Sequence, residues 1–119
     1  LYSCIEKIKS RGVKAGVVLS PATNEDTLKY VLDKIDMILL MTINPGEAGP
    51  GFHEELLTKI KNVRELIGDR DIDLEVDGGI DNTNIAKCKE AGVNVFVSGG
   101  YVFKGDIAEK IKTLREALK

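Results

Sequence analysis

The sequence predicts an α/β protein organised around a parallel β-sheet. Four short segments are almost wholly apolar, without polar alternation, which is typical of strands buried on both faces. Between them lie segments whose apolar residues recur at helical spacing. Strands that alternate with helices pair in parallel through right-handed crossovers. We therefore expect one domain over residues 1–119.

The first part of the chain predicts helix, strand, helix and strand in turn. Residues 1–11 have helical apolar spacing, and residues 13–19 form a β-branched run. Thr23 is the expected N-cap of the second helix, since Asp26 follows three residues later. A second buried strand is expected at residues 36–41. The apolar face of the second helix is expected at Leu28, Val31, Leu32 and Ile35.

The second part continues this alternation after a long loop at residues 44–52. A short helix is expected to begin at Asp81 or Asn82. After a later strand and a short turn, Asp106 is the expected N-cap of the last helix. The other expected elements are an amphipathic helix at 54–67 and strands at 74–77 and 93–98. The last helix is expected to turn Ile107, Ile111, Leu114 and Leu118 inward.

Two architectures have this order of elements. One is a small open sheet with helices on both faces, as in flavodoxin-like domains. The other is part of a (β/α)8 TIM barrel, of which four units would be about half, since a complete barrel takes about 200 residues or more. Both architectures bind ligands at the carboxyl ends of the strands, where this chain gathers glycine and small polar residues.

Composition excludes several classes of partner. A net charge of −2 gives no reason to expect nucleic acid or an acidic membrane. No apolar run approaches the roughly 18 residues that a membrane span needs, and charge enters too early at the start for a signal peptide. The two cysteines lie too far apart for a zinc-finger or redox motif. We expect a cytoplasmic protein without membrane or nucleic-acid partners.

Glycine pairs and one acid mark the candidate site. Gly78 and Gly79 follow one expected strand, and Gly99 and Gly100 follow the next. Backbone N–H groups at such strand ends bind phosphate, although the same glycines also suit tight turns. Asp77 directly precedes the first pair. It is a candidate general base or metal ligand, or alternatively an acid that caps the turn.

Three other features carry weaker signals. Met41 ends a strand and suits either a pocket wall or the core. The loop at residues 44–52 is long for a strand-to-helix connection, and long loops at this face often act as lids. His53 is the only histidine, so a multi-histidine metal site is excluded, and we expect it at the surface.

Several of these segments, in this order and spacing, resemble the C-terminal half of the ribulose-phosphate 3-epimerase family. The resemblance covers nearly the whole chain and favours the barrel, with this chain as strands five to eight. It implies an isomerase of the pentose phosphate pathway that interconverts D-ribulose 5-phosphate and D-xylulose 5-phosphate. The segments that carry it are residues 16–23, 40–46, 75–80 and 95–103, together with Phe52.

The resemblance also implies a mechanism and a site. One aspartate removes the proton at C3 to give an enediolate, a divalent metal stabilises the oxyanion, and a second aspartate returns a proton to the opposite face. Asp77 matches the aspartate that is both acid/base and metal ligand, and Met41 matches a methionine near the enediolate. The implied phosphate cradle is Gly78, Gly79, Gly99 and Gly100. The implied substrate loop is Gly46, Glu47, Ala48 and Gly49.

The family's other aspartate and two metal-binding histidines belong to the N-terminal half of the barrel. A divalent ion such as Zn, Fe, Mn or Co would therefore need ligands from outside this chain. We expect the isolated chain to be unable to bind the metal normally, to self-associate as a homo-oligomer and to lack epimerase activity.

Departures from the family pattern leave other functions open. Glu47 and Ala48 replace an aromatic residue and a glycine, Pro50 replaces a common glutamine, and Gly100 replaces a serine. One alternative is a ketohexose 6-phosphate (allulose 6-phosphate) 3-epimerase. Others are a non-catalytic phosphate-binding half-barrel and another phosphate-binding barrel enzyme, such as a decarboxylase or synthase.

Overall fold

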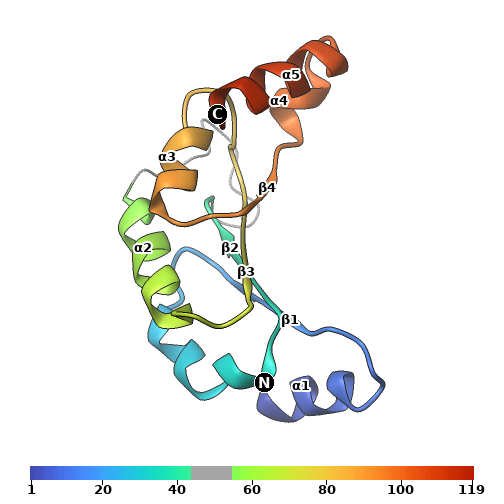
Figure 1. Ribbon diagram of the computed structural model, residues 1–119, viewed down its shortest axis with the longest axis vertical. Helices are drawn as coiled ribbons and strands as arrows, with labels where there is room; N and C mark the ends of the chain where they lie inside the picture. Colours follow the sequence, from blue (N-terminus) through green and yellow to red (C-terminus); the bar gives the residue numbers. More distant parts are fainter. Residues whose placement is uncertain (44–54) are drawn as a thin grey trace.

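The computed structural model describes residues 1–43 and 55–119, which form a four-stranded parallel sheet with helices packed on it (Figure 1). The predicted α/β class is confirmed. The expected loop at residues 44–52 lies outside the described residues. The strands are β1 (Gly16–Leu19), β2 (Met37–Met41), β3 (Asp73–Asp77) and β4 (Val95–Val97).

The order of the strands decides between the two architectures. They pair in sequence order, β1-β2-β3-β4, and every neighbouring pair is parallel. A flavodoxin-like sheet reverses its strand order at a switch point, whereas a barrel adds each strand beside the last. The flavodoxin-like alternative is therefore wrong, and the arrangement is that of a (β/α)8 barrel part.

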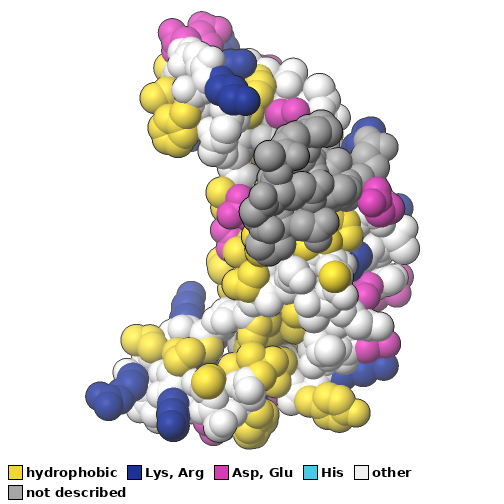
Figure 2. All heavy atoms as spheres, turned by 180° about the vertical axis from the view of Figure 1, so that it is seen from behind, with side chains coloured by type: hydrophobic (Ala, Val, Ile, Leu, Met, Phe, Trp, Pro, Cys, Tyr) yellow, Lys and Arg dark blue, Asp and Glu magenta, His cyan; other side chains and the backbone are white. Residues whose placement is uncertain are grey.

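The shape of the molecule agrees with an incomplete barrel. The radius of gyration is 15.0 Å, against about 13.5 Å for a compact domain of this length. The space-filling view in Figure 2 shows a hollowed side between the two ends of the molecule, with hydrophobic side chains gathered along it. This hollow corresponds to the inner side of a barrel wall.

The core lies on the helical face of the sheet. The α-helices are α1 (Tyr2–Lys9), α2 (Leu56–Ile67), α3 (Ile85–Ala91), α4 (Gly100–Phe103) and α5 (Ile107–Ala117). Alternate strand residues are buried on this face, whereas Val18, Leu39 and Glu75 on the opposite face are partly or largely exposed. Burial on both faces was therefore a wrong prediction for the described residues. The apolar face of α2 is confirmed at Leu56, Ile60, Val63 and Ile67.

The second expected helix is instead a pair of 3₁₀ helices, η1 (Glu25–Tyr30) and η2 (Leu32–Lys34). Its N-cap is Asn24, whose side chain accepts the Asp26 N–H at 2.8 Å. The predicted cap, Thr23, shares a hydrogen bond of 3.0 Å with Ser20 and so does not cap. The predicted apolar face is nevertheless buried, at Leu28, Val31, Leu32 and Ile35.

Three predictions near the C-terminus need correction. α3 begins at Ile85 because Asp81 accepts the N–H and hydroxyl of Thr83 and forms a turn first. The segment after the second glycine pair is the one-turn helix α4 rather than a turn. On α5, Ile107 and Ile111 are 47% and 36% exposed, because the helix packs on α4 and α3 through its other side. The Asp106 cap is confirmed by its bond to the Glu109 N–H.

None of the helices within residues 1–43 and 55–119 has both the length and the apolar character that crossing a membrane requires.

Candidate functional site

The register of the sheet brings three strand ends together. Met41 of β2 and Val97 of β4 are both Cα partners of Asp77, the last residue of β3. Their strand neighbours Leu40 and Val76 are buried on the helical face, so Met41 and Asp77 lie on the open face, since successive side chains of a strand alternate. The carboxyl ends of the strands thus place Asp77 between two apolar side chains.

A cavity of about 540 Å³ opens at these strand ends. Five predicted site residues line it, namely Asp77, Gly78, Gly79, Gly99 and Gly100. Met41 lies next to Asp77 on the neighbouring strand but does not itself line the cavity. The other predicted site residues, Gly46, Glu47, Ala48 and Gly49, lie outside the described residues, as does His53.

The cavity also contains residues that sequence reasoning missed. Asp81, Tyr101 and Lys104 line it together with the glycines. The Lys110 ammonium lies 4.2 Å from the centre of the Tyr101 ring, a cation–π contact that fixes the ring. Lys104 follows Gly100 by four residues, and the helical turn of α4 carries its side chain back to the cavity. A helical prediction for that segment would have found this lysine.

The first glycine pair contains a position that packing requires to be glycine. Gly78 has φ of +134°, and a Cβ there would lie 2.9 Å from Ile43 N and 3.0 Å from the Thr42 hydroxyl. The end of β2 therefore presses directly on the turn after β3. Only glycine accommodates both this backbone conformation and this close approach.

The second glycine pair is different. Neither Gly99 nor Gly100 has a positive φ, and a Cβ at either position would meet nothing within 4 Å. The tight-turn explanation therefore does not account for these two residues. Their missing side chains leave open space at the cavity, which favours the alternative in which a ligand approaches the backbone.

The described residues do not make up a metal centre. Within residues 1–43 and 55–119, no three side chains of His, Cys, Asp or Glu come together as metal ligands do. Asp77 and Asp81 line the cavity, but divalent metal sites need more donors than two carboxylates. These residues alone do not fit the divalent ion that the family resemblance implies.

Lys59 of α2 fixes the loop that follows β1. Its ammonium donates to the carbonyls of Ser20 and Pro21 at 2.8 and 3.2 Å, and also to the carbonyl of Thr23. Partial burial lowers the pKa of Lys59, while Glu25 opposes that effect. The contacts hold the carboxyl end of β1 against the helical layer.

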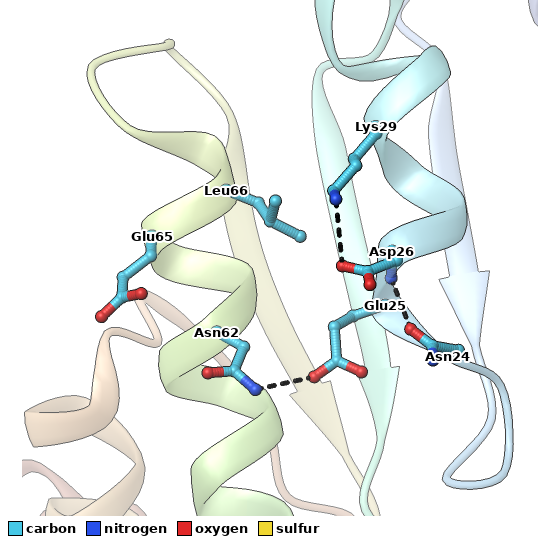
Figure 3. A pocket seen from close by; sticks show the side chains of 7 residues that line it. All are labelled: Asn24, Glu25, Asp26, Lys29, Asn62, Glu65 and Leu66. Atoms are coloured by element: carbon cyan, nitrogen blue, oxygen red, sulfur yellow. Dashed lines mark hydrogen bonds and ion pairs between the residues drawn. The ribbon is translucent and has the colours of Figure 1, made fainter.

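A second cavity, of about 420 Å³, lies between η1 and α2 and is shown in Figure 3. Four of its polar side chains interact in two pairs. The Asn62 amide donates to Glu25 at 3.1 Å, and the Lys29 ammonium lies 3.7 Å from an Asp26 oxygen. We interpret it as a structural groove in the helical layer, since the glycine pairs and Asp77 lie at the other cavity.

Comparisons with known proteins identify the family. The ribulose-phosphate 3-epimerase family model matches residues 1–103. The ribulose-phosphate 3-epimerase of Serratia marcescens is 52% identical over 101 residues, which are 83% of this chain and 48% of that protein. The chloroplastic ribulose-5-phosphate-3-epimerase of Arabidopsis thaliana is 42% identical over 97% of this chain and 42% of its own length. The ribulose-phosphate 3-epimerase of Escherichia coli K12 is 43% identical over 96% of this chain and 52% of that protein.

The chain spans about half the length of these curated relatives. A crystal structure of 3-hexulose-6-phosphate synthase superposes on 98% of this chain and 55% of its own, with a TM-score of 0.72 and 22% identity. That similarity supports the barrel fold and nothing finer. From the family model and the curated relatives together, the chain belongs to the ribulose-phosphate 3-epimerase family.

Proposed function

We propose that this chain provides one half of the active site of a pentose-phosphate 3-epimerase, which interconverts D-ribulose 5-phosphate and D-xylulose 5-phosphate. The observation that carries the proposal is the shared cavity of Asp77 and the two glycine pairs. A carboxylate suits proton transfer at C3, which is acidic because C2 is a carbonyl. The open backbone at Gly99 and Gly100 suits the phosphate at the other end of the sugar.

Inversion at C3 through an enediolate needs proton transfer on both faces of that carbon. Asp77 would serve one face, taking the proton in one direction of the reaction and returning it in the other. The acid/base group for the second face would come from outside this chain. The isolated chain would therefore bind sugar phosphate without epimerising it.

The proposal includes a divalent ion, Zn, Fe, Mn or Co, for which this chain supplies one ligand. Asp77 is the residue of this chain that would hold the ion, with the remaining ligands supplied from outside the chain. When bound, such an ion stabilises the negative charge that develops on the substrate oxygen. We further propose a cytoplasmic location and a homo-oligomeric state.

The test is complementation of the missing half. The chain is purified and mixed, or produced together, with the N-terminal half of the Serratia marcescens relative. We expect conversion of ribulose 5-phosphate and exchange of its C3 proton with deuterium from D₂O, both followed by NMR. The chain alone should show neither. Epimerisation by the chain alone at the rate of an ordinary enzyme would contradict the proposal. The proposal would also be wrong if the two halves form a folded complex that binds phosphate but shows no epimerase activity.

A ketohexose 6-phosphate is the second candidate substrate. Gly100 stands where the resemblance expects serine, and the space around its Cβ position is empty to 4 Å. That position therefore lacks a hydroxyl donor and has extra room. The same assay with allulose 6-phosphate decides between the sugars, because the faster of the two in kcat/KM is the substrate.

A further inference from the structure

Four consecutive carbonyls of the turn after β3 are each held by a donor. The N–H of Thr42 donates to the Asp77 carbonyl at 3.0 Å, and the Thr42 hydroxyl donates to the next carbonyl, that of Gly78. The Asn84 amide donates to the Gly79 carbonyl at 2.8 Å. The Ser98 hydroxyl donates to the Ile80 carbonyl at 2.7 Å.

These three side chains come from three different elements. Thr42 follows β2, Asn84 precedes α3 and Ser98 follows β4, so the donors come from the two neighbouring strand ends and from the start of the helix that follows the turn. Their sequence separations from the carbonyls are 36, 5 and 18 residues. The turn is thus fixed by tertiary contacts as well as by its local sequence.

Two of these three residues are buried polar side chains. Thr42 and Asn84 are 0% and 6% exposed, and they are the buried polar residues among the described positions. Burying a polar side chain is costly unless it forms hydrogen bonds. Both serve this one turn, and Asn84 also accepts the Asp81 N–H at 3.0 Å.

The direction of the carbonyls determines the direction of the N–H groups. In a trans peptide the C=O and the following N–H point in opposite directions, and no peptide bond within residues 1–43 and 55–119 is cis. With the carbonyls of Gly78 and Gly79 turned toward Thr42 and Asn84, the N–H groups of Gly79 and Ile80 point away from those side chains. No acceptor within residues 1–43 and 55–119 contacts either N–H, and both residues line the cavity.

We infer that Thr42, Asn84 and Ser98 are positioning residues that hold the turn after β3 so that its peptide N–H groups are set to bind the phosphate of the substrate. This inference rests on the proposed function, and it extends that function to three residues that do not line the cavity. A fixed turn binds an anion more tightly than a mobile one, because less conformational freedom is lost on binding.

The test uses inorganic phosphate as the probe and the 119-residue chain as the protein. Binding is followed through the amide signals of Gly79 and Ile80 in ¹H–¹⁵N NMR spectra. The variants are Thr42→Val, Asn84→Leu and Ser98→Ala, each of which removes a side-chain donor with little change in size and no change in charge. We expect each to weaken phosphate binding by about three- to tenfold, the effect of one hydrogen bond.

Matched controls separate positioning from general stability. Thr113→Val and Ser10→Ala each remove a hydroxyl that donates to a backbone carbonyl far from the cavity, at 3.0 and 2.6 Å. These controls should bind phosphate like the parent, and Thr42→Ser, which retains the hydroxyl, should restore most of the affinity. Ser98→Ala keeps the test valid if a buried variant fails to fold, because Ser98 is only half-buried.

The outcomes distinguish the positioning role of the three residues from the proposed phosphate site itself. If the parent binds phosphate and all folded variants bind it equally well, the positioning role is wrong while the proposed phosphate site stands. Equal weakening in the variants and in the Thr113 control also contradicts positioning. If the parent chain does not bind phosphate at all, the proposed function loses its phosphate site and the inference falls with it.

Discussion

Met41 and Asp77 are directly opposite each other across the parallel pair of β2 and β3. Both side chains lie on the open face of the sheet, so the carboxylate at the end of β3 has a thioether as its neighbour on one side. Met41 is half-buried and Asp77 is exposed. The pair places the proposed acid/base at the rim of an apolar wall, where it is accessible to a substrate that enters the cavity.

Replacing Asp77 by asparagine tests that role. In the complemented enzyme we expect Asp77→Asn to lower kcat by about 10²- to 10⁴-fold with a small change in KM, because an amide does not transfer the C3 proton. Steady-state kinetics with ribulose 5-phosphate measure both constants. The control is Asp73→Asn at the other end of β3, where an amide still accepts the 2.8 Å hydrogen bond from Asn94. Asp77→Asn with parent kcat would exclude Asp77 from proton transfer.

Lys104 is expected to contribute a positive charge to phosphate binding. It lines the cavity, and no carboxylate in the described ranges pairs with it. Lys104→Met should weaken binding of inorganic phosphate about three- to tenfold and reduce its dependence on salt. Calorimetric titrations at two ionic strengths measure both effects. Lys112→Met, an equal loss of charge on the exposed side of α5, should change neither.

Local patterns predicted those parts of the molecule that local sequence determines. β-branched runs predicted the strands, and Asp77 with the glycines after it marked the cavity. Helical spacing predicted the buried face of the second helix, but it predicted neither the 3₁₀ form nor the cap at Asn24 in place of Thr23. Lys104 was missed because its place depends on α4.

The three residues that hold the glycine turn were not predictable from local sequence. Nothing in the local sequence marks Thr42, Asn84 or Ser98 as a contact of this turn, and two of them contact carbonyls 36 and 18 residues away in the chain. Such contacts follow from the register of β2, β3 and β4, which periodicity does not specify. The open face of the sheet was also mispredicted, since apolar runs alone do not tell how many faces other elements cover.

Asp36 is expected to make the stability of the fold dependent on acid pH. Its carboxylate accepts the Lys9 ammonium at 2.9 Å and the Ala15 N–H at 2.8 Å. Both bonds hold the pKa of Asp36 below its ordinary value of 3.8, and the bond from Lys9 has the larger effect. The stabilisation is therefore present above about pH 4 and is lost as pH falls through the lowered folded-state pKa.

Urea unfolding at a series of pH values measures this effect. Below pH 3.8 the free energy of unfolding should fall more steeply for the parent than for Asp36→Asn, which has no charge to lose. Lys9→Met should show an intermediate slope, since the Ala15 N–H still binds the carboxylate. Parallel curves for the parent and Asp36→Asn would contradict the prediction.

Substitutions at Gly12 and Gly92 distinguish the backbone strain of an added side chain from its steric collision with a neighbour. Gly12 has φ of +75° with nothing within 4 Å of a Cβ, whereas Gly92 has φ of +123° and its Cβ would lie 2.7 Å from Arg64 Cγ. Gly12→Ala should cost about 1 kcal/mol of unfolding free energy from the backbone alone. Gly92→Ala should cost roughly 2–4 kcal/mol, because the collision adds to the backbone cost.

Chemical denaturation of both variants gives these values. The Arg64 guanidinium also donates to the Gly92 carbonyl at 2.9 Å, so Arg64→Ala alone destabilises the chain. Combined with Gly92→Ala it should cost less than the sum of the two single changes, because the collision is removed. Equal losses for Gly12→Ala and Gly92→Ala would show that the contact with Arg64 has no effect.

The open side of the sheet predicts self-association of the isolated chain. β1 and β4 each have one neighbouring strand, so each presents an unpaired edge among the described residues. Val18 of β1 is 59% exposed on the open face. Unpaired edges beside an apolar face pair readily with another chain, and lysine is a common natural protection of such edges. Light scattering should therefore give a mass well above 13.0 kDa for the parent, and a lower mass for Val18→Lys.

Tyr30→Lys is the matched control, since Tyr30 is 87% exposed but lies on η1 in the helical layer. It introduces the same charge in place of an exposed apolar side chain without touching the sheet. If association follows the open sheet, Tyr30→Lys leaves the mass unchanged. Equal effects of the two lysines would assign association to exposed apolar surface in general. A parent that remains monomeric at high concentration would mean that the edges of this half-barrel do not pair, and the proposed homo-oligomer would then be wrong.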